Sequence, residues 1–584
     1  MVKKILSYVK EYKAASVATP IWMVFEVIFE TLIPLCMASI VDNGVNKHNM
    51  QHIQFMGLVM AGLAIGGLLS GFLGGIYGAK ASTGLARNLR SAMFEKIQTY
   101  SFSNIDKFST AGLVTRLTTD VTNVQNAYHM ILRMCFRAPF SLIIAMIAAF
   151  VIEPKIASIY LAAVGLLGIV LFFIVRKAMK YFSEVFKKYD DLNAAVQENV
   201  KGIRVVKAYV REEHETERFK KAAENIYGMF VRAEKMVVIN APIMQFTVHS
   251  CILLISWVGA HMIVQEELLT GELMSLLTFC MNILMSLMLL SFIFVMVSMS
   301  TASAKRIAEV LDEEPDIKDP ENPVTEVKDG SIVFEDVEFS YAKNSDAEAV
   351  LRDVDLEIKS GETIGIIGGT GSGKTTLVSL ISRLYDVCDG SVKVGGRDVK
   401  EYSLDTLRKE VSVVLQKNVI FSGTIYDNLR WGNPDASDEE CREACRKACA
   451  DDFISSFPDG YETRIEQGGT NVSGGQKQRL CIARALLKEP KILILDDSTS
   501  AVDTATDAKI RKTFREELPD ITKIIIAQRV SSVQDADRII VLDDGCIKGF
   551  DTHENLLKSN AIYREVYESQ TGGNGDFDEK GGEL

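Results

Sequence analysis

Gly368-Gly-Thr-Gly-Ser-Gly-Lys374-Thr375 is the stretch of sequence that decides how the C-terminal half of this chain folds. It has the spacing of a phosphate-binding loop, and it lies between a strand-like run at 363–367 and a helix that we expect to begin near Thr376. The glycines let backbone N–H groups curl around phosphate oxygens, and the helix N-terminus adds positive potential. We therefore predict an α/β domain that binds ATP through the residues of this loop, Gly368, Gly369, Thr370, Gly371, Ser372, Gly373, Lys374, Thr375 and Thr376.

The residues expected to bind Mg²⁺ and adenine come from the loop and from two other stretches of the sequence. Lys374 is expected to reach the β- and γ-phosphates, and the Thr375 hydroxyl is expected to coordinate Mg²⁺. Further along, Lys491-Ile-Leu-Ile-Leu-Asp496-Asp497 reads as a buried strand that ends in acids, so Asp496 is predicted to hold Mg²⁺ through water. Tyr341 ends a strand-like run that starts at Ile332, and its flat ring is placed to stack on adenine.

The N-terminal half has a different composition. The 584 residues have a mean hydropathy of +0.13 although 24% of them are charged, and the apolar excess lies before about residue 300. The net charge of −12 and the pI near 5.3 argue against nucleic acid as a partner, because nucleic-acid binding needs a basic face. A lipid bilayer is the partner that this composition indicates.

A membrane-spanning helix needs about 20 mainly apolar residues. The third candidate reaches that length only when 131–137 is included, with Arg133 and Arg137 near the interface. The predicted spans are 14–41, 55–79, 131–152, 156–175, 236–264 and 273–300.

Lysine and arginine predict the orientation of these spans. The connecting segments 80–137 and 176–235 are dense in basic residues, whereas the three short connections carry only Lys47 and Lys155. Basic segments stay on the cytoplasmic side, so both termini and both long segments are expected there. The long segments hold few prolines or glycines, so we expect the membrane helices to continue into the cytosol, with tips at Asn104–Asp120 and near Gly202–Glu213 that contact the C-terminal domain.

Glu26 and Glu30 lie within the first predicted span. Carboxylates inside a membrane are costly and usually face a bundle interior or an aqueous cavity. Two interpretations stay open: the pair lines a substrate cavity, or it forms a structural pair with Arg133 or Arg137.

These observations divide the chain into four predicted regions. The charged stretch that follows Ala304 reads as a linker, and the acidic C-terminal end reads as disordered. The regions are a transmembrane domain at 1–304, a linker at 305–329, a nucleotide-binding domain at 330–570 and a tail at 571–584.

A second group of motifs carries a family resemblance. Asn471-Val472-Ser473-Gly474-Gly475-Gln476 matches the signature of ABC ATPases and lies between the phosphate loop and Asp496. Gln416 looks like the family's Q-loop glutamine, and Ser500 and Asp503 look like its D-loop. With six preceding spans, the chain to about residue 570 resembles a half-transporter of the multidrug-type ABC exporter family.

The resemblance implies a fold, partners and an activity. The fold is an all-α six-helix transmembrane domain with long cytoplasmic extensions, followed by an α/β P-loop ATPase domain. Two halves pair, and each ATP lies between the phosphate loop of one half and the signature of the other, here Val472, Ser473, Gly474, Gly475 and Gln476. Gln416 joins the Mg²⁺ ligands, and the tip near Lys201–Glu213 reaches the partner's domain. The implied function is ATP-driven export of small hydrophobic or amphipathic compounds across a bacterial cytoplasmic membrane.

This chain departs from the family at three places. Asp497 stands where the family has a catalytic glutamate, Gln528 stands where it has a histidine, and Glu466-Gln467 replaces a glycine–glutamate pair. The aspartate carboxylate falls one carbon–carbon bond, about 1.5 Å, short of an attacking water, and a general base depends on hydrogen-bond reach.

With Asp497, Gln528 and Gln416 as its catalytic group, the chain resembles the degenerate-site subunit of a heterodimeric exporter. The alternatives are a homodimer with aspartate as base, an importer with the exporter fold, and a nucleotide-gated regulator.

Overall fold

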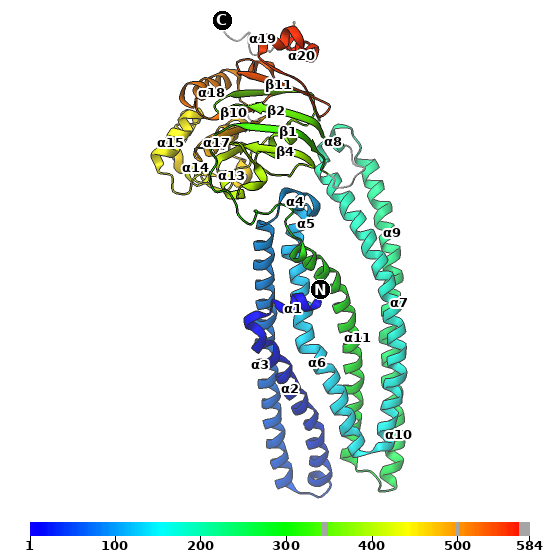
Figure 1. Ribbon diagram of the computed structural model, residues 1–584. Coiled ribbons are helices and arrows are strands. Elements are labelled where there is room, and N and C mark those ends of the chain that lie inside the picture. The colour runs from blue at the N-terminus through cyan, green and yellow to red at the C-terminus, as the bar shows by residue number, and fades with distance from the viewer. Residues whose placement is uncertain (342–348, 498–501, 572–584) are drawn as a thin grey trace. The chain divides into compact units, whose positions relative to one another are not determined.

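The computed structural model describes residues 1–341, 349–497 and 502–571. The chain separates into two compact units (Figure 1). The helical unit comprises Met1–Thr99 and Phe108–Glu313, and the sheet unit comprises Tyr100–Lys107 together with the chain from Glu314 onward. Each unit is described by itself.

The helical unit consists of long helices and short connecting turns. Its helices are α1 (Val2–Ser7), α2 (Lys13–Ser39), α3 (Met50–Gln98), α5 (Thr110–Thr115), α6 (Val121–Ile152), α7 (Pro154–Lys201), α8 (Ile203–Ala208), α9 (Glu212–Val238), α10 (Asn240–Val264) and α11 (Thr270–Asp312).

Six helical segments among the described residues are long and apolar enough to cross a membrane. The prediction of six spans is confirmed. The segments are Lys10–Val45, Met50–Gln98, Thr110–Ile152, Pro154–Ala178, Glu212–Val264 and Thr270–Leu290.

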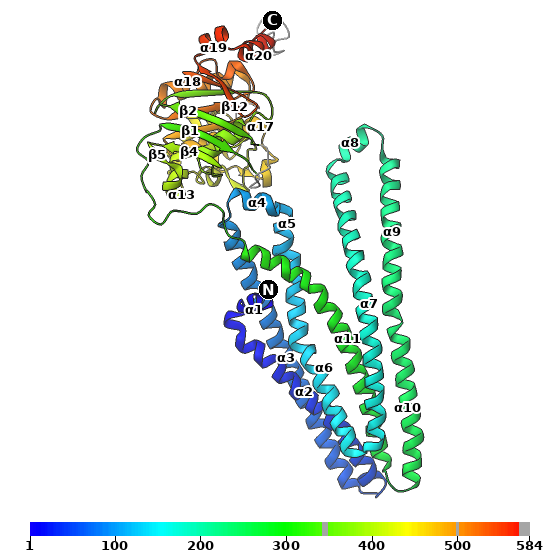
Figure 2. The ribbon, with the colours of Figure 1, turned by 45° about the vertical axis from the view of Figure 1, so that its right-hand side comes forward.

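The glycines of α3 explain how closely it packs on α2 (Figure 2). A Cβ atom on Gly66 would lie 3.2 Å from the ring of Phe29, and one on Gly74 would overlap the end of Met23. Small residues at such positions let membrane helices approach each other. The glycines on this face of α3 therefore leave room for the side chains of α2.

The structure corrects the start of the predicted linker. Residues from Lys305 onward are charged, yet α11 continues through them to Asp312. Their charges are used in packing: Arg306 Nε donates to Asp120 at 2.7 Å, and the side chain of Asp120 is only 1% exposed. A charged stretch that pairs with a neighbouring helix stays helical, so the prediction of a linker from residue 305 was wrong at this end.

The first cytoplasmic tip is also more ordered than a turn. Asn104–Asp120 contains the end of α4 (Phe102–Phe108), the whole of α5 and a π-helical turn at Arg116–Asp120. Its first part belongs to the sheet unit, where Asn104 Nδ2 donates to the carbonyl of Glu314 at 3.1 Å.

The sheet unit is an α/β fold with three sheets among its described residues. The first is a four-stranded antiparallel sheet in the order β2-β1-β4-β5, the second is a six-stranded, mainly parallel sheet in the order β12-β11-β3-β10-β9-β6, and the third pairs β7 with β8. Its strands are β1 (Ile332–Phe339), β2 (Leu351–Ile358), β3 (Thr363–Ile367), β4 (Asp389–Val394), β5 (Arg397–Asp398), β6 (Val411–Val414), β7 (Gly423–Thr424), β8 (Arg464–Ile465), β9 (Ile492–Asp496), β10 (Thr522–Ile526), β11 (Arg538–Asp543) and β12 (Cys546–Asp551).

Helices cover the six-stranded sheet and complete the unit. The strands β3, β9 and β10 are almost wholly buried, as expected for parallel strands covered on both faces. The helices are α12 (Lys374–Ile381), α13 (Leu404–Glu410), α14 (Ile425–Leu429), α15 (Asp438–Lys447), α16 (Asp451–Ser455), α17 (Gly474–Leu486), α18 (Thr504–Glu517), α19 (His553–Ser559) and α20 (Ala561–Thr571).

Candidate nucleotide-binding site

The parallel strands bring the predicted site residues to one edge of the six-stranded sheet. β3 pairs with β10, β10 pairs with β9 and β9 pairs with β6, all in parallel. Their carboxyl ends therefore lie at the same edge, which is where ligands bind in open α/β sheets. The phosphate loop follows β3, Asp496 ends β9, Gln528 lies just beyond β10 and Gln416 just beyond β6.

The phosphate loop has a backbone that its glycines make possible. Gly371 and Gly373 have φ values of 84° and 95°, a region that favours glycine. A Cβ atom on Gly368 would overlap the carbonyl oxygen of Leu542, so a side chain is excluded there. Helix α12 begins at Lys374, two residues before the predicted start, because Gly373 in its left-handed conformation ends the loop.

The polar groups of the loop suit an anionic ligand. Lys374 Nζ donates to the carbonyls of Gly368 and Gly369, both at 2.7 Å. Burial lowers the pKa of Lys374, and the carboxylates of Asp496 and Asp497 partly oppose that shift. The Ser372 hydroxyl is buried and has no hydrogen-bond partner in the described structure. An orphaned hydroxyl beside a lysine fits a loop that takes up phosphate oxygens.

Thr375 and Asp496 form the oxygen pair that the sequence assigned to Mg²⁺. Thr375 Oγ1 donates to the Asp496 carboxylate, 2.9 Å from Oδ2 and 3.1 Å from Oδ1. Burial raises the pKa of Asp496, and the bond from Thr375 opposes that shift. Hydroxyl and carboxylate oxygens are the ligands that Mg²⁺ prefers, so this pair fits the ion.

Asp497 and Gln528 contact each other directly. Gln528 Nε2 donates to Asp497 Oδ2 at 2.8 Å. The Asp497 backbone is held as well, because its N–H donates to the carbonyl of Ile526 and its φ is 49°. The amide thus occupies one of the two carboxylate oxygens that could accept a proton from water. Sequence reasoning predicted both residues for the site but not this bond.

Tyr341 lies beside the first turn of α12. Its hydroxyl is 2.9 Å from Thr376 Oγ1, and the residue is 52% exposed. Tyr385 packs edge-on against it, with 5.1 Å between the ring centroids, and Tyr385 donates to Asp106 of α4 at 2.9 Å. Burial and the bond to Asp106 raise the pKa of Tyr385. About half of Tyr341 is therefore exposed among the described residues.

The signature residues lie at the N-terminus of α17. Ser473 and Gln476 form a reciprocal capping box, in which Ser473 Oγ accepts from the N–H of Gln476 and Gln476 Oε1 accepts from the N–H of Ser473. Val472 is buried, whereas Ser473 and Gly474 are exposed. No hydrogen bond joins the signature to the phosphate loop in the described part of this chain. An exposed helix N-terminus of this kind attracts anions.

Two other predicted site residues, Gln416 and Asp503, form no hydrogen bond to the phosphate loop among the described residues. Gln416 is exposed and donates no hydrogen bond within the described residues. Asp503 caps α18, accepting from the N–H of Thr506 at 2.9 Å, and this bond lowers its pKa. Ser500 lies outside the described residues.

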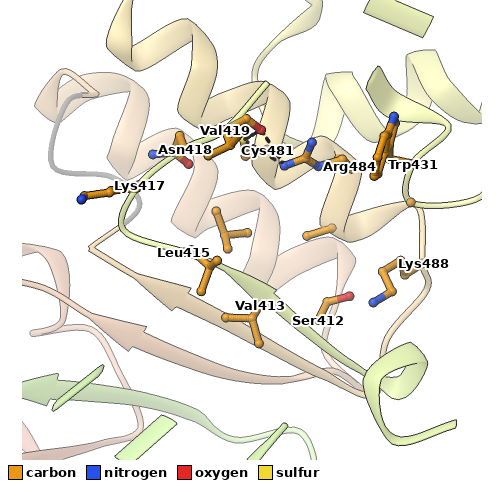
Figure 3. A pocket seen from close by; sticks show the side chains of 13 residues that line it. Ser412, Val413, Leu415, Lys417, Asn418, Val419, Trp431, Cys481, Arg484 and Lys488 are labelled. Atoms are coloured by element: carbon orange, nitrogen blue, oxygen red, sulfur yellow. Dashed lines mark hydrogen bonds between the residues drawn. The ribbon is translucent and has the colours of Figure 1, made fainter. Parts of the chain in front are cut away.

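A groove near Gln416 was not predicted from the sequence. It has a volume of about 250 Å³ and is lined by residues of β6 and of the segment that follows it, by Trp431 and by one face of α17 (Figure 3). Figure 3 shows Lys417 at one end of the groove and Trp431 at the other. Trp431 is 62% exposed and stacks on Phe421 with 4.1 Å between ring centroids. Phe421 and Trp431, two aromatic residues ten positions apart in the segment after β6, are the sequence signal that marks it.

The two intramembrane carboxylates are paired with one arginine. Arg137 Nη2 lies 3.0 Å from Glu30 Oε2 and 3.6 Å from Glu26 Oε1. Of the two arginines that the sequence left open, the structure selects Arg137.

Comparisons with known proteins agree with this architecture. The family model described as the ABC transporter transmembrane region matches residues 19–302, and the model described as ABC transporter matches residues 351–500. An uncharacterized ABC transporter ATP-binding protein of Bacillus subtilis, YfiB, is 36% identical over 98% of this chain and 99% of its own length. The uncharacterized ABC transporter ATP-binding protein Rv1273c of Mycobacterium tuberculosis is 35% identical over 92% of this chain and 93% of its own length.

A further relative has a described activity. The ATP-dependent lipid A-core flippase of Desulfotalea psychrophila is 31% identical over 83% of this chain and 84% of its own length. With six candidate spans and an ATP-binding domain in one polypeptide, the chain is a multi-pass protein of the cytoplasmic membrane and an ATPase coupled to transport. It belongs to the ABC transporter family, as an exporter half with its transmembrane and ATPase regions fused.

Proposed function

We propose that this chain is one half of a heterodimeric exporter of hydrophobic or amphipathic, lipid-like compounds. In this proposal its own ATP site hydrolyses weakly, while its signature completes the working site of a different partner chain. The flippase relative supports lipid-like cargo, since that protein's name describes a lipid substrate.

The observation that carries the proposal is the contact between Asp497 and Gln528. A base must accept a proton from water at hydrogen-bond distance. The aspartate side chain is short, and one of its oxygens already accepts from Gln528 at 2.8 Å. Gln528 donates a hydrogen bond but carries no positive charge, so it offers less stabilisation of charge on a phosphate than a cationic group does. Both features weaken hydrolysis without weakening binding.

The binding residues of the same site are intact. Lys374 and the loop N–H groups hold the phosphates, Thr375 and Asp496 hold Mg²⁺, and Tyr341 stacks on adenine. Mg²⁺, when bound, neutralises charge on the phosphates. The site thus retains ATP, and retention without rapid hydrolysis is what defines a degenerate site.

The partner is inferred from two exposed surfaces. Ser473 and Gly474 are exposed at the N-terminus of α17 and form no hydrogen bond to the phosphate loop among the described residues. The groove beside Trp431 offers apolar and aromatic contacts of the kind enriched at protein interfaces. We assign the first surface to the partner's ATP and the second to the partner's cytoplasmic tip.

Steady-state ATPase activity of the purified two-chain complex tests this proposal. Ser473→Ala is expected to reduce turnover by at least tenfold, because it removes a contact to the partner's nucleotide that is worth about 1.5–3 kcal/mol. Asp497→Asn is expected to reduce turnover less than twofold, because its carboxylate contributes little. Ser422→Ala, in the loop before β7, is the matched serine control.

The opposite pattern would refute the heterodimer. If this chain, purified alone, hydrolysed ATP rapidly and Asp497→Asn abolished that activity, the chain would be a homodimer that uses aspartate as its base.

A further inference from the structure

Two arginines one turn apart in the membrane-spanning part of α6 are in different electrostatic situations. Arg137 is shared by Glu26 and Glu30 of α2, at 3.6 and 3.0 Å. Arg133, in contrast, has no carboxylate within ion-pair distance among the described residues, and its Nε atom is buried without a hydrogen-bond partner. The cluster therefore has an excess carboxylate near Arg137 and an uncompensated cation at Arg133.

Glycines of α3 hold these groups in one seam between α2, α3 and α6, which lie side by side (Figure 2). The Glu26 carboxyl lies against Gly71, where a Cβ atom would be 3.2 Å from the carboxyl carbon. The stem of Arg133 lies against Gly78, where a Cβ atom would be 3.4 Å from Cγ. Gly71 and Gly78 are two turns apart on α3 and share one face, so the two charged groups border the same seam.

Two buried atoms in this seam have no partner. One is an acceptor, Glu26 Oε2, and the other is a donor, Arg133 Nε. Leaving either group unsatisfied is unfavourable. The occupant that satisfies both offers a donor to Glu26 and an acceptor to Arg133. An ammonium and a phosphate do so with charge in addition. Gly71 and Gly78, against which Glu26 and Arg133 lie, are about 10 Å apart along the axis of α3. A short amine-to-phosphate linker spans this separation with one hydrogen bond at each end.

The cluster is reachable from outside the chain. The side chains of Glu30, Arg137 and Glu26 are 48%, 33% and 21% exposed. Charged groups are costly against lipid tails and usually face a pathway inside the bundle. The exposed side of the cluster is therefore assigned to a water-accessible pathway.

We propose that this cluster is a headgroup site for an amphiphile that carries both a phosphate and a primary amine. Arg133 binds the phosphate, Glu26 and Glu30 bind the ammonium, and Arg137 positions the two carboxylates. A quaternary ammonium has no N–H to donate to Glu26, so the site distinguishes a primary amine from choline. The proposal deepens the proposed function, because it rests on export of lipid-like compounds.

Native mass spectrometry of the purified complex with defined lipids tests the site. Phosphatidylethanolamine carries phosphate and primary amine, phosphatidylglycerol lacks the amine, phosphatidylcholine lacks the N–H, and a long-chain alkylamine lacks the phosphate. Phosphatidylethanolamine is expected to bind about tenfold or more tightly than each of the others. Free phosphoethanolamine in the same assay distinguishes a soluble ligand from a membrane lipid.

The variants identify the groups responsible. Arg133→Gln is expected to remove the preference for phosphate over alkylamine, and it breaks no ion pair, so it remains informative if Glu26→Gln fails to fold. Glu26→Gln is expected to remove the preference for the ethanolamine over the glycerol lipid. Glu267→Gln, which breaks the exposed ion pair with Lys155 (3.1 Å), is the control.

Equal binding of all four lipids to the unmodified complex would refute the proposed headgroup site. Water alone would then supply the hydrogen bonds of Glu26 Oε2 and Arg133 Nε. Unchanged lipid preferences in both variants would overturn it as well. Failure of the proposed function is a separate result: no amphiphile would then stimulate ATP hydrolysis or be transported in vesicles.

Discussion

Replacing Gly368 by alanine is expected to damage nucleotide binding, whereas the same change at its neighbour Gly369 is expected to be harmless. A Cβ atom on Gly368 would overlap the carbonyl oxygen of Leu542 and lie 2.7 Å from Ser372 Oγ. Leu542 belongs to β11, which pairs with β3, so its backbone cannot move without disturbing the sheet. A Cβ atom on Gly369 would meet nothing within 4 Å.

The size of the effect follows from this geometry. Forcing extra volume against fixed backbone costs about 1–3 kcal/mol, which corresponds to an ATP affinity roughly 5- to 150-fold weaker if binding needs the undistorted loop. The assay is calorimetric titration of ATP into the full-length protein with Mg²⁺, for Gly368→Ala, Gly369→Ala and the unmodified chain. Equal affinities for the two variants would show that the loop does not hold the phosphates in the way described.

Two further predictions concern the same site. Lys374→Ala is expected to weaken ATP binding by about 10- to 100-fold, because the hydrogen bonds of Lys374 to a charged phosphate are stronger than the two bonds to carbonyls that they replace. Lys417→Ala is the control. Unchanged ATP affinity in Lys374→Ala would contradict the assignment of Lys374 to the phosphates. Asp496→Asn is expected to raise the melting temperature of the nucleotide-free protein at pH 7.5 but to remove the stabilisation given by Mg²⁺ with ATP. A carboxyl group whose pKa is raised by folding opposes the folded state once it is ionised. The rise in melting temperature caused by Asp496→Asn should therefore shrink as the pH falls toward 4. A rise that does not depend on pH would contradict this explanation.

The sequence was sufficient for features that depend on local spacing. Each of these features is contained in one continuous stretch of sequence. They are the phosphate loop after a buried strand, the acids at the end of β9 and the six long apolar stretches. The structure has a strand at Thr363–Ile367 and six candidate spans where these patterns predicted them. These patterns can be recognised in the sequence alone because backbone hydrogen bonding and membrane thickness constrain each segment separately.

Features that depend on side chains meeting across the fold were not predictable. The bond between Asp497 and Gln528 joins residues 31 positions apart, and it exists because β9 and β10 pair in a register that brings Asp496 opposite Ile526. The choice between Arg133 and Arg137 was open because residues four apart share one helix face. The linker boundary predicted at Lys305 was wrong because it also depends on a contact between residues far apart in the sequence. The sequence alone does not show that Arg306 contacts a buried Asp120.

The continuity of α11 has a mechanical consequence. Its 43 residues run without a proline from Thr270 to Asp312, a rod of about 65 Å. A tilt of about 5° at the outer end of α11 displaces Asp312 by about 6 Å. The last membrane helix is therefore able to act as a lever along its whole length.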